Sequence, residues 1–177
     1  MWSRLMSRFC WPWAALLVAL PLPAAQAAPA PQPAACLAGA ELVALSGTWQ
    51  AEALAHVPGG VAPSRQRLQL QVGADGRVRG QRDWAAVITG PGAVQGRDRQ
   101  GQAAYTDMQP MIGWIEPRSC RVLLVETEDA GRVSGWLRRQ GGVPLLELEI
   151  SQSGRGAVVV MAEFRQLPAS PRAPGKR

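Results

Sequence analysis

The chain has 177 residues, of which 47% are hydrophobic and 18% are charged. This size and composition fit one folded domain and exclude both a disordered polymer and a large multidomain enzyme. The formal net charge of +6 would suit binding to nucleic acid or to an anionic surface. With a single histidine and a single tyrosine, the chain has few of the side chains that usually carry catalysis.

The first 27 residues have the pattern of an export signal. Arg4 and Arg8 make the start basic, residues 9–20 are apolar and uncharged, and Ala25-Gln26-Ala27 is a small-x-small cleavage site. The apolar stretch is shorter than the roughly twenty residues that a membrane-spanning helix needs. The preference for Arg over Lys, with abundant Ala and Gly, is typical of a bacterium with a GC-rich genome. We therefore expect residues 1–27 to be a cleaved signal peptide, no transmembrane segment after its removal, and a periplasmic or secreted protein.

Composition divides the expected mature chain into three parts. Residues 28–35 are rich in proline and alanine and predict a flexible lead, and residues 168–177 predict a flexible basic tail. Residues 36–167 form the folded unit. Because residues 1–27 and 168–177 hold five of the nineteen basic residues and no acid, the folded unit has a net charge near +1. Nucleic-acid binding thereby loses its main support.

Removal of the signal peptide would leave two cysteines, Cys36 and Cys120. In an oxidising compartment such a pair is more often a disulfide than a pair of reactive thiols, and the two lack the spacing of a metal site. We expect a structural disulfide that closes a loop of 85 residues, worth on the order of 4 kcal/mol in the chain-entropy model. We expect no metal and no cofactor.

Within the folded unit, apolar residues recur with a period of two, which is typical of half-buried strands. Residues 37–45 are the exception, because their leucines fall at helical spacing and predict a short helical entry. Residues 67–72 and 77–79 alternate on either side of Gly73-Ala74-Asp75-Gly76, which has turn chemistry, so this segment predicts a β-hairpin. Further strands are expected at residues 45–52, 121–128, 132–139, 145–151 and 157–167, with weaker candidates at 85–89, 102–105 and 111–116. The pattern predicts an all-β fold, an antiparallel up-and-down meander of about eight strands that closes into a barrel.

Short motifs connect this pattern to a known superfamily. Gly47-Thr48-Trp49 opens the first strand and Arg165 lies in the last, a pairing that resembles the Gly-x-Trp and late arginine of the calycins, the lipocalins and avidins. The resemblance implies a closed barrel in which Trp49 packs at the closed end and Arg165 lies across its ring in a cation–π contact. Gly113-Trp114 and Gly135-Trp136 resemble the tryptophan-bearing strands of the same superfamily.

The sequence departs from these families at the residues that would identify a ligand. The Asn, Ser, Tyr and Asp set with which avidins bind biotin has no residue-by-residue counterpart, so biotin binding is not inferred. Thr106-Asp107-Met108 only echoes the second lipocalin motif. The chain also resembles a small periplasmic barrel that inhibits secreted metalloproteases and carries a Ser-Gly-x-Trp strand and one disulfide. In that family the cysteines follow the tryptophan strand, whereas Cys36 precedes it.

Catalytic arrangements have little support. His56 comes just before a Pro-Gly-Gly sequence, so we expect it in a loop and not as a general base. Glu147 and Glu149 share one face of their strand, and we expect both to point into solvent opposite Arg138 or Arg165. A glycosidase pair would instead need one acid in an apolar environment. We therefore expect a protein that is not an enzyme.

Residues 83–113 interrupt the regular meander with glycines, prolines and aromatic side chains. Loops on a rigid barrel are where binding residues concentrate, although an ordinary connection without a ligand is the alternative. The candidate binding residues are Trp84, Tyr105, Trp114 and Trp136, which could line a cavity or belong to the core.

We expect an exported, non-catalytic binding protein of the bacterial envelope. It would hold a small apolar ligand or another exported protein through the barrel mouth and its loops. The alternatives are a structural or assembly component of the cell envelope and a barrel that resembles the protease inhibitors.

Overall fold

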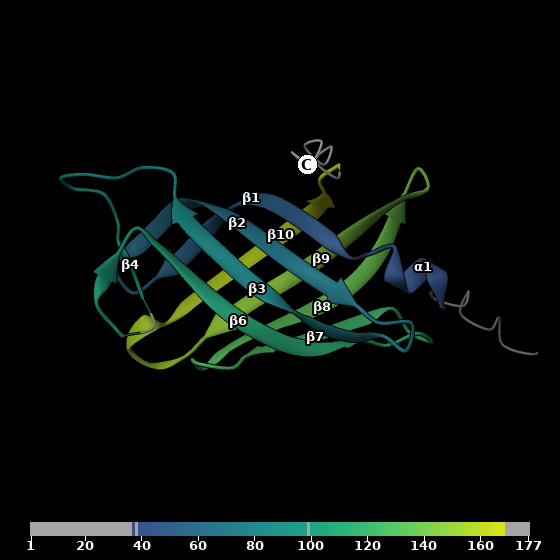
Figure 1. Cartoon of the computed structure of the whole chain (residues 1–177). Helices are drawn as coiled ribbons and strands as arrows, with labels where there is room; N and C mark the ends of the chain where they lie inside the picture. The colour runs from purple at the N-terminus through teal and green to yellow at the C-terminus, as the bar shows by residue number, and fades with distance from the viewer. Residues whose placement is uncertain (1–36, 38, 99, 169–177) are drawn as a thin grey trace, which may run out of the picture. The chain divides into compact units, whose positions relative to one another are not determined.

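A closed antiparallel β-barrel is the main feature of the computed structural model, which describes residues 37, 39–98 and 100–168 (Figure 1). The predicted signal peptide, the lead at residues 28–35, Cys36 and all but the first residue of the predicted tail lie outside the described residues. Among the described residues, no helix has the length and apolar character needed to cross a membrane.

Eight long strands form the barrel wall, and their order around it follows the chain. They are β1 (Gly47–Val57), β2 (Gly60–Val72), β3 (Arg77–Ala86), β6 (Thr106–Ile115), β7 (Arg121–Glu126), β8 (Gly131–Gln140), β9 (Val143–Gln152) and β10 (Val158–Gln166). Each strand pairs antiparallel with the next, and β10 returns to pair with β1, so that Trp49 lies opposite Gln166 and His56 opposite Val159. The prediction of an all-β, up-and-down closed barrel of about eight strands is confirmed.

Three small elements accompany the barrel. The helix α1 (Ala40–Val43) precedes β1, and the 3₁₀ turn η1 (Gly154–Gly156) connects β9 to β10. The connection from β3 to β6 contains a two-stranded sheet of β4 (Gly96–Arg97) and β5 (Ala103–Ala104). The predicted helical entry is present, but as a single turn, in which Leu42 is buried.

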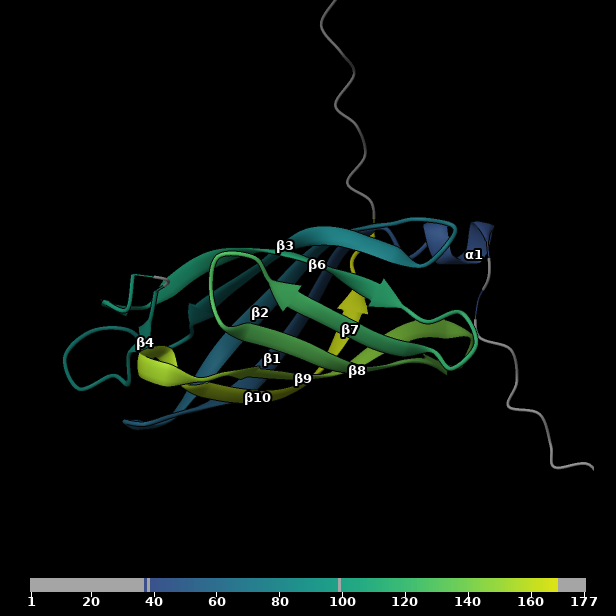
Figure 2. The same ribbon diagram turned by 90° about the horizontal axis from the view of Figure 1, so that it is seen from below.

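The connections lie at two opposite ends of the barrel (Figures 1 and 2). We call the end with α1 and the turns 73–76, 116–120 and 141–142 the helix end. The loop end holds the turns 58–59, 127–130 and 153–157 and the long connection 87–105, which we call the mouth loop.

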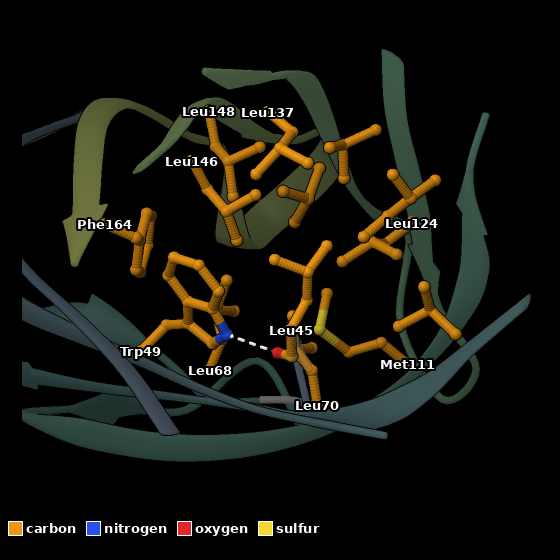
Figure 3. Packing of buried hydrophobic residues seen from close by; sticks show 14 of the residues in the cluster. Leu45, Trp49, Leu68, Leu70, Met111, Leu124, Leu137, Leu146, Leu148 and Phe164 are labelled. Atoms are coloured by element: carbon orange, nitrogen blue, oxygen red, sulfur yellow. Dashed lines mark hydrogen bonds between the residues drawn. The ribbon is translucent and has the colours of Figure 1, made fainter. Parts of the chain in front are cut away.

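Large apolar side chains fill the barrel interior toward the helix end (Figure 3). Leu42 and Leu45, which precede β1 in the chain, are buried in this cluster. Trp49 is fully buried, and its Nε1 donates a hydrogen bond of 2.9 Å to the carbonyl oxygen of Leu45. Phe164 from β10 and Leu146 from β9 are equally buried beside it. The first and last strands thus meet around one tryptophan.

The predicted hairpin at residues 67–79 is confirmed, but its two strands are longer than expected. The turn is formed by a bond of 2.9 Å from the Gly76 N–H to the Gly73 carbonyl. Gly76 has a φ of 85°, and a Cβ there would lie 2.2 Å from the Ile115 carbonyl oxygen, so the turn requires glycine. The strand β2 begins seven residues earlier than predicted and β3 ends seven residues later.

Two of the three weaker strand predictions are wrong, because β3 is longer than predicted. Residues 85–89 are not a separate strand, because 85 and 86 end β3 and the chain then enters the mouth loop. Residues 102–105 contain only the short β5, which pairs with β4 outside the barrel sheet. The third, residues 111–116, is the second half of β6.

The prediction that His56 lies in a loop is wrong. It belongs to β1, where it is exposed and lies opposite Val61 of β2. The turn to β2 needs only Pro58 and Gly59, so the strand continues past the histidine.

Candidate functional site

A cavity of about 210 Å³ lies at the loop end of the barrel. Its wall consists largely of small side chains, among them Ala55, Ala62, Ala86 and Val160. The cavity exists because inward-facing residues shrink along the strands. In β1 the inward side chain changes from Trp49 near the helix end to Ala55 near the loop end, so the barrel is filled at one end and hollow at the other.

A polar network forms the floor of this cavity. Gln66 donates through Nε2 to Ser64 Oγ at 3.1 Å, and Arg82 Nη1 donates to Gln66 Oε1 at 3.4 Å. Arg82 Nη2 lies 2.7 Å from Glu126 Oε1 and also donates to Gln109. The side chains of Arg82 and Glu126 are only 2% and 0% exposed. A buried ion pair therefore connects β3 with β7, on either side of β6, at the floor of the cavity.

Burial and charge act in opposite directions on this ion pair. Burial lowers the pKa of Arg82, and the nearby Glu126 raises it again. Burial raises the pKa of Glu126, and Arg82 opposes that shift. An arginine stays protonated in proteins, so Glu126 supplies the charge that balances it. Removing either partner would leave the other charge buried without compensation.

The mouth loop packs against the rim of the cavity at two places. Gly96 of β4 lies against the Trp84 ring, and a Cβ on Gly96 would approach that ring to 2.6 Å. Val94 lies against the β1–β2 turn, where a Cβ on Gly59 would lie 3.9 Å from its methyl group. Glycine at position 96 thus lets the loop lie flat on a tryptophan that itself lines the cavity.

Tyr105 holds the base of the mouth loop. Its hydroxyl donates to the Gly90 carbonyl at 3.0 Å and accepts from the Gly90 N–H at 3.2 Å. Of the four candidate binding residues, Trp84 therefore lines the cavity and Tyr105 fixes the loop beside it.

Trp114 and Trp136 lie on the outer face of the barrel, so the expectation that they could line a cavity inside the barrel is wrong. Their exposed fractions are 48% and 49%. The residues that point inward at these places are Gly113 and Gly135, and alternation along a strand sends each neighbouring tryptophan outward. The guanidinium of Arg138 lies 5.7 Å from the ring centre of Trp136.

The expected contact of Arg165 with the Trp49 ring is also wrong. Trp49 is buried inside the barrel, whereas Arg165 is exposed on the outer face. There its Nη2 donates to Gln140 Oε1 at 3.1 Å. The inward residue of this part of β10 is Phe164, one position before the arginine.

Glu147 and Glu149 point into solvent, as predicted from their alternation with leucine. Glu147 Oε2 accepts a hydrogen bond of 3.0 Å from Arg138 Nε, which is the first of the two expected partners. Within residues 37, 39–98 and 100–168, no group of three His, Cys, Asp or Glu side chains has the arrangement of a metal site.

Two residues at the floor of the cavity, Arg82 and Glu126, were not predicted from the sequence, each for a different reason. Arg82 was missed because the inward series of β3 includes Gly80 and Arg82 and so lacks an apolar period. Glu126 carried a usable signal, since it follows Val122 and Leu124 at spacings of two and therefore shares their inward face.

In comparisons with known proteins, no family model matches this chain, and no curated protein matches it significantly.

Proposed function

We propose that this protein is an exported, calycin-like barrel that binds a small molecule in the cavity at its loop end and does not catalyse a reaction. The observation that carries the proposal is the cavity itself, which combines small apolar walls with a few buried polar groups. That combination is typical of small-molecule sites. The calycin-like assignment is supported by the eight-stranded closed barrel and by a Gly-x-Trp tryptophan buried toward the helix end.

The compartment and the disulfide belong to the same proposal. The N-terminal pattern supports export to the periplasm or the medium. Leu37, the neighbour of Cys36 in the chain, is part of the buried core, and Cys120 packs against that same core. We therefore keep the Cys36–Cys120 disulfide as a proposal. If both thiols of the exported protein react with an alkylating reagent before any reduction, the disulfide is not formed.

Native mass spectrometry of the protein isolated from its own host tests the binding function. We expect a small-molecule adduct on the wild-type protein. Ala62→Phe places a ring into the cavity and should abolish the adduct, whereas Ala74→Phe, in an exposed turn at the helix end, should retain it. Circular dichroism checks that both variants fold. A wild-type protein without any adduct, or an adduct that survives Ala62→Phe, would contradict the cavity as the site.

One observation favours a second candidate, the binding of another exported protein. On the outer face, Ile112 and Trp114 of β6 lie opposite Val125 and Leu123 of β7, and all four side chains are exposed. A contiguous exposed apolar patch of this kind often marks a protein contact. Recovery of a stoichiometric partner by the wild type and by Val159→Gln, but not by Trp114→Gln, would support this candidate.

A further inference from the structure

The charges that line the cavity have one sign. Three charged residues contribute to its lining, and all are arginines: Arg82, Arg97 and Arg155. No carboxylate is among the described residues that form the lining. The folded unit has nearly as many acidic as basic residues. The excess of arginines around the cavity is therefore local and does not reflect the charge of the whole domain.

Two of these arginines lack a balancing carboxylate. Arg82 is paired with Glu126. In the described part of the chain, neither Arg97 nor Arg155 has a carboxylate oxygen within 4.0 Å. The nearest acid in sequence, Asp98, instead accepts hydrogen bonds from the backbone N–H groups of residues 100 and 102.

Both arginines belong to adjoining segments of the rim. A Cβ on Gly156 would lie 3.8 Å from Cβ of Arg97, so η1, which contains Arg155, lies against β4. Arg97 uses Nη1 to bind the Gly101 carbonyl at 2.7 Å, and the other donors of its guanidinium remain for a ligand. On the floor, Arg82 Nε has no hydrogen-bond partner among the described residues. Arg97 and Arg155 are exposed residues on adjoining segments that both line the cavity, and guanidinium groups without a counterion provide the planar donors that a carboxylate accepts.

The size and walls of the cavity limit the rest of the ligand. An apolar cavity of about 150 Å³ takes up benzene, so about 210 Å³ admits a substituted ring or a short chain. A long acyl chain would not be enclosed by it. Trp84, Val57 and Val158 provide an apolar wall for such a body.

We propose that the ligand is a small organic carboxylate, with its carboxylate on Arg97 and Arg155 at the rim and its apolar body against Trp84 within the cavity. This inference rests on the proposed function and names its ligand class. It predicts discrimination against neutral molecules of the same shape, because binding a neutral amide would leave the rim cations without a counterion.

Two matched pairs of probes test the charge preference in the intact chain: phenylacetate with phenylacetamide, and hexanoate with hexanamide. Titrations followed by the NMR signals of Trp84 Nε1–H and the Gly96 amide report binding in the cavity. We expect at least one carboxylate to bind roughly tenfold more tightly than its amide, the scale of a hydrogen bond to a charged group.

Arginine variants distinguish an effect of the two rim arginines from an effect of the protein's net charge. Arg97→Gln combined with Arg155→Gln should remove the preference for the carboxylate while leaving amide binding unchanged. Arg118→Gln combined with Arg121→Gln removes the same charge at the helix end and should change neither. Equal binding of carboxylate and amide, or a preference that survives the rim variants, overturns the inference but leaves the proposed function in place. If none of the four probes shifts the cavity signals and the protein from its host carries no adduct, the inference and the proposed function both fail.

Discussion

At the scale of single residues, Arg82 and Glu126 are the side chains on which the interior depends most. Both are buried, and Arg82 also binds Gln66 and Gln109. A buried ion pair adds little net stability compared with apolar side chains of the same volume, but loss of one partner is costly. Loss of one member is therefore expected to cost much more than the complete pair contributes.

This asymmetry gives a prediction for stability. Arg82→Gln should lower the free energy of unfolding at neutral pH by about 3–5 kcal/mol, because it leaves the buried Glu126 carboxylate without its counter-charge. Replacing both residues by methionine should recover most of that loss, since no charge is then left buried. Urea denaturation of the wild type and the two variants measures the effect. A double variant as unstable as Arg82→Gln would show that the hydrogen-bond network, and not the charge balance, determines stability.

Burial of Glu126 also gives a prediction for pH dependence. Since burial raises the pKa of Glu126 above its ordinary value of 4.5, the folded protein binds this proton more tightly than the unfolded chain does. The stability from this group is therefore fully present below pH 4.5 and is lost as the pH rises through the raised pKa. A titration of the Glu126 carboxyl carbon by NMR should give a pKa above 4.5. A lower value would mean that attraction to Arg82 outweighs burial.

At the scale of elements, the sequence predicts strands best where their inward residues are apolar. The inward series Leu146, Leu148 and Ile150 defined β9 almost completely. The loop-end halves of β2 and β3 were missed because Ser64, Gln66 and Arg82 occupy their inward positions. These same polar residues form the floor of the cavity, so the candidate site lies where the pattern failed. Trp84 and Tyr105 at the rim lay in the predicted loop region, but no local pattern could show that the floor residues meet, since they come together only when the barrel closes.

The mouth loop offers a prediction at this scale. Tyr105→Phe removes both hydrogen bonds to Gly90 while leaving the barrel strands intact. Because loops open at a lower free energy than the strands that carry them, we expect faster hydrogen exchange within residues 87–105 and almost no change in urea midpoint. Exchange measured by mass spectrometry on peptides from the loop and from β9 checks this. Faster exchange in both regions would mean that Tyr105 supports the whole fold.

At the scale of the whole molecule, one barrel performs two tasks. The helix end holds the fully buried Trp49, Phe164 and Leu68 and provides the core. The loop end has smaller side chains and leaves a cavity. The sequence predicted closure from the number of strands and their tight turns. The division into a filled and a hollow end depends on which side chains face each other across the barrel. The sequence of a single strand does not contain this information.

Closure by the last strand gives a prediction for truncation. A chain that ends after residue 152 lacks β10 and leaves β1 and β9 with unpaired edges. It should lose cooperative unfolding, because Trp49 no longer has Phe164 beside it. A chain that ends after residue 168 keeps all eight strands and should unfold like the full chain. Near-ultraviolet circular dichroism and thermal unfolding compare the two, and a cooperative transition in the shorter chain would contradict the prediction.

The pairing of β1 with β10 also sets the order of events during protein synthesis. The first strand to leave the ribosome must wait for the last before the wall can close, and contacts between distant parts of a chain form slowly. Until then the edges of β1 and β9 lack their partner strand, and the Trp49 indole lacks the Phe164 ring beside it. For a protein with the export signal proposed here, late closure keeps translation and folding apart in time.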